Sequence, residues 1–152
     1  MLPPRIDKEI VRNSIGEYAD KNTSVEERSK IYEELLGFVP PRIEARLHVT
    51  GALDPQIVEM QERMREHAMY PKCFDVKTAQ LMLFGMLLMD GSDASVLHGI
   101  AARKAGASWE EMQAVVNLCF LFRGMSDANR GAEQLANIAK RGFDVENKRR
   151  RR

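Results

Sequence analysis

The stretch from Gly91 to Glu111, GSDASVLHGIAARKAGASWEE, constrains the fold most, because it marks where one helix ends and the next begins. Its spacing predicts a helix from about Asp93 to Ala105, with Asp93 as the N-cap. Gly106 can close that helix in the left-handed conformation, and Ser108 with Glu111 forms a capping box for the next one. A turn this short predicts that the two helices pack as an antiparallel hairpin. The face predicted to point inward consists of Ala94, Leu97, His98, Ala101 and Ala105.

Similar punctuation recurs along the chain, and no alternating strand pattern bounded by turn residues accompanies it. The sequence therefore predicts an all-α fold with the 76–90 helix at its centre. Other helices are expected over 24–36, with Ser24 and Glu27 as a capping box, over 54–68, over 108–123 and from Ser126 to Gly142, with a short helical piece between Pro40 and Gly51. In the last helix we expect Ala132, Leu135, Ala136 and Ala139 to face inward.

The chain has 152 residues, 44% of them hydrophobic, which suits one domain with one core. We expect that domain over residues 24–143. A weakly amphipathic helical arm is expected over 1–23, and a basic, solvated tail over 144–152. The formal net charge is only +1, so the composition predicts no nucleic-acid or membrane partner.

Signals for export, membrane insertion or metal binding are missing from the pattern. The N-terminus lacks a secretory h-region, and the longest apolar run, Leu81 to Met89, is too short to cross a bilayer. Cys73 and Cys119 lie far apart in sequence, as expected of a reducing compartment. The three histidines lack metal-ligand spacing, and no phosphate-binding loop is present. We therefore expect a cytoplasmic protein with no metal and no cofactor.

The second half carries a recognisable series: an apolar helix, a short polar turn, H-x-x-A-A-x-x-A-G beginning at His98, then Ser-x-Glu-Glu from Ser108. Over Lys77 to Ala136, with the lead-in YEELLGFVPPRI from Tyr32 to Ile43, this resembles the carboxymuconolactone decarboxylase family, which includes the alkylhydroperoxidase-D-like proteins. The resemblance implies an antiparallel helical bundle that assembles as homotrimers or homohexamers, with active sites near subunit contacts.

Three positions depart from that family's pattern. The Cys-x-x-Cys pair of the peroxidase branch falls on Gly91 and Ala94, so thiol peroxidase chemistry is set aside. The glutamate of the decarboxylase branch also falls on Ala94. A further acid, found early in the preceding helix in the peroxidases, falls at or beside Ala79 and Gln80. The decarboxylase-like branch without the Cys-x-x-Cys motif is the nearer match.

The chemistry expected from these residues centres on His98. An imidazole can stabilise a developing enolate and return a proton near neutral pH. The resemblance favours a functional His98, whereas composition alone favours a structural core histidine. His48 and His67 are weaker candidates. The expected substrate is a small carboxylated compound, and the residues predicted to bind it are Gln80, Asn117, Arg123 and Trp109, with Arg130 and Arg103 as second choices for the cation.

Two functions of different classes therefore follow from the sequence. The leading one is a cofactor-independent lyase (a decarboxylase) or isomerase that works through an enolate-type intermediate on a small carboxylated or carbonyl compound. The alternative is a non-catalytic oligomeric binding or scaffold protein of the same fold. A peroxidase using Cys119 alone is the least favoured, because Cys119 lies on an apolar helix face and is expected to be a small buried hydrophobe. The many Met and Phe side chains also predict a homo-oligomer.

Overall fold

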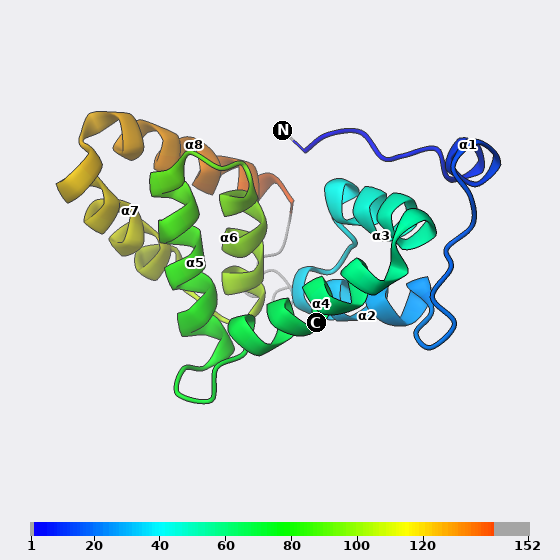
Figure 1. Ribbon diagram of the computed structural model, residues 1–152. Helices are drawn as coiled ribbons and strands as arrows, with labels where there is room; N and C mark the ends of the chain where they lie inside the picture. The colour runs from blue at the N-terminus through cyan, green and yellow to red at the C-terminus, as the bar shows by residue number, and fades with distance from the viewer. Residues whose placement is uncertain (1, 142–152) are drawn as a thin grey trace, which may run out of the picture. The chain divides into compact units, whose positions relative to one another are not determined.

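The computed structural model describes residues 2–141, and its secondary structure over this range is entirely helical (Figure 1). The prediction of an all-α fold is confirmed for these residues. They form two compact units, one ending at Met69 and the other beginning at Tyr70. This boundary falls within the range predicted as one domain, 24–143, and the single domain stays a prediction. The helix bounds are α1 Lys8–Ser14, α2 Val25–Leu36, α3 Pro41–Leu53, α4 Pro55–Met69, α5 Val76–Asp90, α6 Ala94–Lys104, α7 Trp109–Arg123 and α8 Met125–Lys140.

In the first unit, α3 packs against α1, α2 and α4. The predicted capping box begins α2: the Ser24 side chain accepts from the Glu27 backbone N–H, and Glu27 accepts from that of Ser24. Gly37 ends the helix at φ +85°, a left-handed conformation that glycine adopts without strain. The core of the unit is Tyr32, Leu47 and Val58.

A buried polar network surrounds Tyr32 at this core. Its hydroxyl donates to Glu62 Oε1 at 2.6 Å, and Arg46 contacts both groups. The guanidinium of Arg65 lies 4.1 Å from the centroid of the Tyr32 ring. Burial and the hydrogen bond to Glu62 raise the pKa of Tyr32, so this hydroxyl stays protonated and serves as a hydrogen-bond donor.

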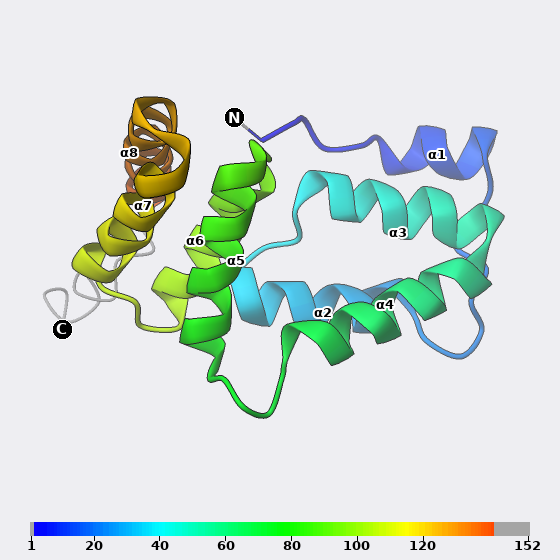
Figure 2. The same cartoon turned by 60° about the vertical axis from the view of Figure 1, so that its left-hand side comes forward.

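The predicted N-terminal arm contains α1, which lies along α3 (Figure 2). Asp7 caps α1, and the Nζ atom of Lys8 lies 3.0 Å from a carboxylate oxygen of Glu44, a buried residue on α3. Ile10 remains exposed. Ion pairing to one buried acid therefore helps to hold the arm against its own unit.

The second unit is built around α5, which packs against α6, α7 and α8, as the sequence predicts. Its fully buried side chains include Phe84, Leu88, Ile100, Met112 and Val116. Glycines allow the helices to approach closely: a Cβ atom on Gly131 of α8 would lie 2.5 Å from Val116 Cγ1 of α7. The tight packing of this unit therefore depends on small residues at helix crossings.

The predicted hairpin of α6 and α7 is wrong. Instead α6 packs on α5 and α8, while α7 packs on α8 and α5. Gly106 turns the chain at φ +103°, and the guanidinium of Arg103 donates to the carbonyl of Ala107 in the same turn. A short turn fixes the distance between two helix ends but not the direction in which the second helix leaves.

Two predicted inward faces are also displaced. On α6, Ala101 is buried as predicted, but Ser95, Gly99 and Ala102 are buried as well, whereas Ala105 is exposed. On α8, Ala132, Ala136 and Ala139 are exposed and Leu135 is half-buried; Asp127, Gly131, Gln134 and Ile138 are buried instead. The reason is packing and polar pairing, since Gly131 fits against Val116 and Gln134 accepts a hydrogen bond from Ser95.

Two predicted helix starts differ in detail. Asp93 occupies the N-cap position of α6, but its backbone is already helical and its side chain makes no capping bond; Ser92 Oγ accepts from the Ala94 N–H instead. The last helix begins at Met125, so Ser126 lies inside its first turn. Gly142 and the predicted tail 144–152 lie outside the described residues. No helix among those described has the length and apolar character needed to cross a bilayer.

Candidate functional site

The structure joins two of the predicted site residues, His98 on α6 and Gln80 on α5. Gln80 Oε1 lies 2.7 Å from His98 Nδ1. An amide oxygen can only accept, so Nδ1 carries the proton and donates to Gln80. This leaves Nε2 as the basic nitrogen of the ring. The pair thus selects one tautomer and one orientation of the imidazole.

Gln80 is fully buried, with 0% of its surface exposed, whereas His98 is half-buried. The Gln80 side-chain Nε2 atom is also buried and has no hydrogen-bond partner among the described residues. An unpaired buried donor costs about 1–3 kcal/mol. A glutamine therefore stands where an apolar residue would stabilise the fold more, which indicates that its amide oxygen is retained for His98.

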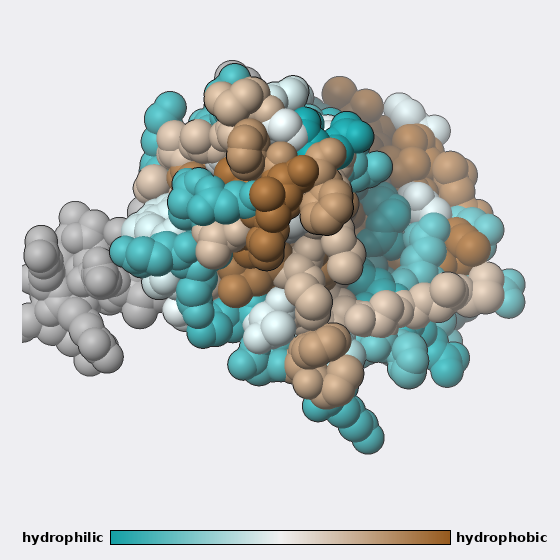
Figure 3. Space-filling model, turned by 90° about the vertical axis from the view of Figure 1, so that its left-hand side faces the viewer, coloured by the Kyte–Doolittle hydropathy of each residue, from teal (hydrophilic) through white to brown (hydrophobic). Residues whose placement is uncertain are grey.

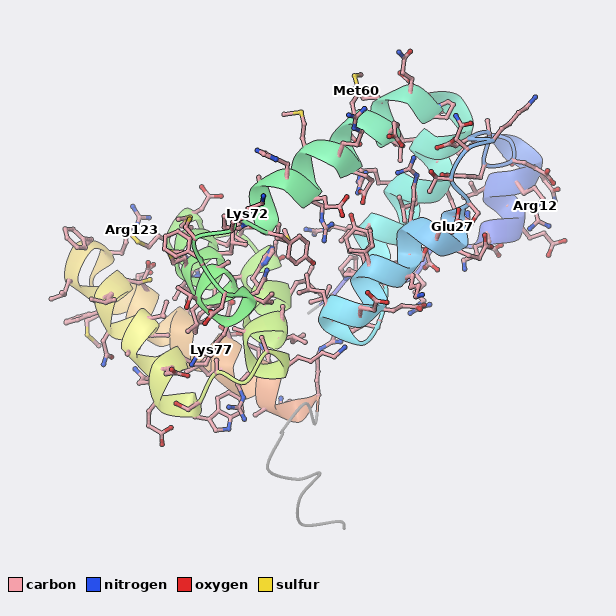
Figure 4. All side chains as sticks on the ribbon, turned by 90° about the horizontal axis from the view of Figure 1, so that it is seen from below. Arg12, Glu27, Met60, Lys72, Lys77 and Arg123 are labelled. Carbon is pink, nitrogen blue, oxygen red and sulfur yellow. The ribbon has the colours of Figure 1, made fainter. Side chains whose placement is uncertain are left out.

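The other predicted binding residues make different contacts. Asn117 is exposed on α7 and accepts from Gln113 Nε2 at 2.8 Å, one turn earlier. Arg123, the last residue of α7, is exposed (Figure 4). Trp109 is half-buried, and the guanidinium of Arg103 lies 4.1 Å from its ring centroid. The predicted contact of Asn117, Arg123 and Trp109 with a substrate therefore remains a prediction from the sequence.

Both arginines named as second choices hold helix ends in place. Arg130 Nη2 donates to the Leu88 carbonyl at 3.1 Å, near the C-terminus of α5, and Nη1 lies 3.6 Å from Asp127 Oδ1. Arg103 is buried and binds the Ala107 carbonyl after α6. These contacts explain both arginines as part of the fold.

The sequence interpretation missed a set of buried polar residues in the second unit. Ser95 Oγ donates to Gln134, and it lies 2.8 Å from the Ser92 carbonyl oxygen. Asp127 is 2% exposed, and its Oδ2 has no hydrogen-bond partner within the described part of the chain. The only sequence signal for Asp127 is its place three residues after Gly124, which is the N-cap of α8, where an acid is favoured.

Cys119 is buried as predicted. Its thiol donates to the Gly85 carbonyl at 3.5 Å. Burial, and secondarily the charge of Asp127, raise the pKa of the Cys119 thiol, which disfavours the thiolate. This environment is the opposite of the one that activates a nucleophilic cysteine.

The remaining histidines lie in the first unit. His67 is exposed near the end of α4. His48, on α3, lines a pocket of about 230 Å³ together with Lys8, Arg12 and Glu17. Burial, and secondarily the charge of Lys8, lower the pKa of His48, so its ring is neutral at pH 7.

A salt bridge links the starts of α5 and α7. Lys77 Nζ lies 2.9 Å from Glu111 Oε1 (Lys77 is labelled in Figure 4). Hydrogen bonds from the Ser108 backbone and from Lys77 lower the pKa of Glu111. This carboxylate is thus engaged in capping and pairing.

No group of three or more His, Cys, Asp or Glu side chains suited to a metal ion occurs among residues 2–141. Comparisons of the chain with protein-family models, with curated proteins and with solved structures found no match. We therefore infer the function from the residues themselves, above all from the pairing of His98 with Gln80.

Proposed function

We propose that this protein is a cofactor-independent lyase (a decarboxylase) or isomerase of the carboxymuconolactone decarboxylase type. It would be a cytoplasmic homotrimer or homohexamer with the antiparallel bundle of that family, acting on a small carboxylated or carbonyl compound. The observation that carries the proposal is the 2.7 Å contact between His98 Nδ1 and the buried amide of Gln80, whose Nε2 has no hydrogen-bond partner among residues 2–141.

The proposed chemistry uses His98 as the proton carrier. In an isomerisation, Nε2 takes a proton from the carbon next to a carbonyl, and the electron pair moves to the carbonyl oxygen as an enolate. Where a second double bond is conjugated with this enolate, the imidazolium returns the proton to the far carbon of the conjugated system. In a decarboxylation, the carbon–carbon bond breaks, CO₂ leaves and the enolate receives its proton from imidazolium. The resulting imidazole is then reprotonated from water.

Gln80 suits this role because an amide does not take a proton itself. It holds the ring and accepts from Nδ1–H in both the neutral and the charged state, so the charge change stays on the imidazole. Arg123 and Asn117 would bind the substrate carboxylate and carbonyl, with Trp109 lining the pocket, as the sequence predicts.

The test is proton NMR in deuterated water with a panel of carboxylated lactones, β-keto acids and enolisable ketones. We expect loss of carboxylate or uptake of deuterium with the unaltered protein, and at least about a 100-fold loss of rate in the His98→Gln variant, which is the lower end of the range for general acid–base catalysis. His67→Gln is the matched control, since His67 is exposed on α4. Equal rates in the unaltered and His98→Gln proteins would contradict the mechanism.

The second candidate is a non-catalytic oligomeric binding or scaffold protein. One observation favours it: Asp90 and Asp93, the acids closest to the start of α6, are both exposed. If the unaltered protein is folded but turns over none of the lactones, β-keto acids and ketones, the result would favour this second candidate.

A further inference from the structure

A stripe of large apolar side chains lies exposed on the second unit. Leu118, Leu121 and Phe122 share one side of α7, because residues three and four apart on a helix are neighbours. Met125 follows directly at the start of α8. Their exposed fractions run from 62% for Leu118 to 80% for Phe122. Figure 3, viewed from the side on which α7 lies, shows hydrophobic side chains gathered on this surface.

Helix α5 continues the stripe. A Cβ atom on Gly85 would lie 2.8 Å from Val115 Cγ1, so α5 and α7 touch at this point. Met82 lies three residues before Gly85 and Met86 directly after it, and both side chains are exposed. Leu118 and Phe122 lie three and seven residues after Val115 and so share its side of α7. We call the resulting surface the apolar face; it consists of Met82, Met86, Leu118, Leu121, Phe122 and Met125.

The helix segments that carry the apolar face contain almost no charged residues. The sequence contains no Asp, Glu, Lys or Arg between Thr78 and Met89, and Arg123 is the only such residue between Met112 and Ser126. A partner chosen by charge complementarity would need charged groups here. The chemistry fits another uncharged apolar surface.

The size of the apolar face matches a stable protein contact. With about 200 Å² for a fully exposed side chain of this size, its six residues expose on the order of 700 Å². A specific interface buries about 800 Å² on each partner, whereas apolar patches on monomers seldom exceed 300–600 Å², as rough central values. The face is thus large enough to form most of an interface.

We propose that the apolar face binds the same face of a second copy of this chain across a twofold axis, with α7 against α7. A second copy carries an equally large and uncharged surface at the same concentration, and a twofold contact covers both at once. The inference rests on the self-association already proposed and specifies its surface. A twofold contact through this face is compatible with a hexamer built from three dimers, but not with a trimer formed through the same face.

The test is analytical ultracentrifugation of the full chain from 1 to 100 µM. The Leu118→Glu/Phe122→Glu double variant places two charges in the contact, where unpaired charges are costly. Both positions are exposed, so the fold should tolerate the change, which circular dichroism and a urea melt will check. The control is Met64→Glu, a substitution of the same kind at a position 73% exposed on α4 of the first unit.

We expect the unaltered protein and Met64→Glu to sediment at twice, or a higher even multiple of, the 17.3 kDa chain mass. The double variant should sediment as a monomer or with its dimer contact weakened by at least about 100-fold. A monomeric unaltered protein at 100 µM would overturn both the self-association and the surface. Unchanged assembly of a folded double variant would overturn the surface alone. The enzymatic proposal is tested separately, because His98→Gln should leave the sedimentation unchanged.

Discussion

Replacing Gln80 with leucine separates the positioning of His98 from the stability of the fold. Gln80 is fully buried, its Oε1 serves His98, and its Nε2 is unpaired. Leucine has a similar volume and no polar atoms. If the amide is present for His98, its removal should harm activity but not folding.

The expected change in the free energy of unfolding follows from three contributions. Loss of the hydrogen bond to His98 costs about 1 kcal/mol, and removal of an unpaired buried donor returns about 1–3 kcal/mol. Added apolar burial contributes about 1 kcal/mol more. The net expectation is a stabilisation of about 1–3 kcal/mol. For a unit of this size, each kcal/mol raises the melting temperature by roughly 4–8 °C.

A urea melt followed by tryptophan fluorescence measures this change, because Trp109 is the only tryptophan and lies in the second unit. Gln134→Leu is the matched control: Gln134 is also a buried amide of this unit, but it accepts from Ser95. The loss of its bond to Ser95 and the added apolar burial should roughly cancel, so no net stabilisation is expected. A loss of more than about 1 kcal/mol in Gln80→Leu would instead show that the Gln80 amide is needed for folding.

Three further predictions concern packing, pH and capping. Gly131→Ala should destabilise the second unit by about 1–3 kcal/mol in the same urea melt, because its Cβ would meet Val116 Cγ1 at 2.5 Å and Cβ at 3.2 Å; a gain in stability would contradict this. The NMR titration of His48 should give a pKa below about 6.5, its ordinary value, so the folding stability should fall as the pH drops below about 6.5. Lys8→Gln should raise the pKa of His48. An unchanged pKa of His48 in this variant would exclude Lys8 as a cause of the shift. Ser108→Ala should cost about 1 kcal/mol, measured by the midpoint in urea, because it breaks the α7 capping box; an unchanged midpoint would mean that water replaces the cap.

Features that depend on residues close in sequence were predictable. Both capping boxes join residues three positions apart, so Ser24 with Glu27 and Ser108 with Glu111 specify their helix starts locally. The glycine ends of α2 and α6 follow for the same reason. The central place of α5 could be inferred because its apolar residues cover nearly all of its circumference.

Features that depend on distant contacts were not predictable. The buried side of α8 is set by Gln134, which pairs with Ser95 at a separation of 39 residues, and so the alanine spacing indicates the wrong face. The direction of α7 after its short turn depends on packing against α5 and α8. In the site, Gln80 and His98 were both expected to contribute, but their bond required knowing that α5 packs on α6.

The most direct test of the central claim is the tautomer of His98, measured by long-range proton–nitrogen correlation NMR at a pH where the ring is neutral. We predict a protonated Nδ1 and an unprotonated Nε2 in the unaltered protein, with this preference reduced in Gln80→Leu. A His98 ring protonated at Nε2, or a tautomer equilibrium that does not change when Gln80 is replaced, would show that Gln80 does not position His98.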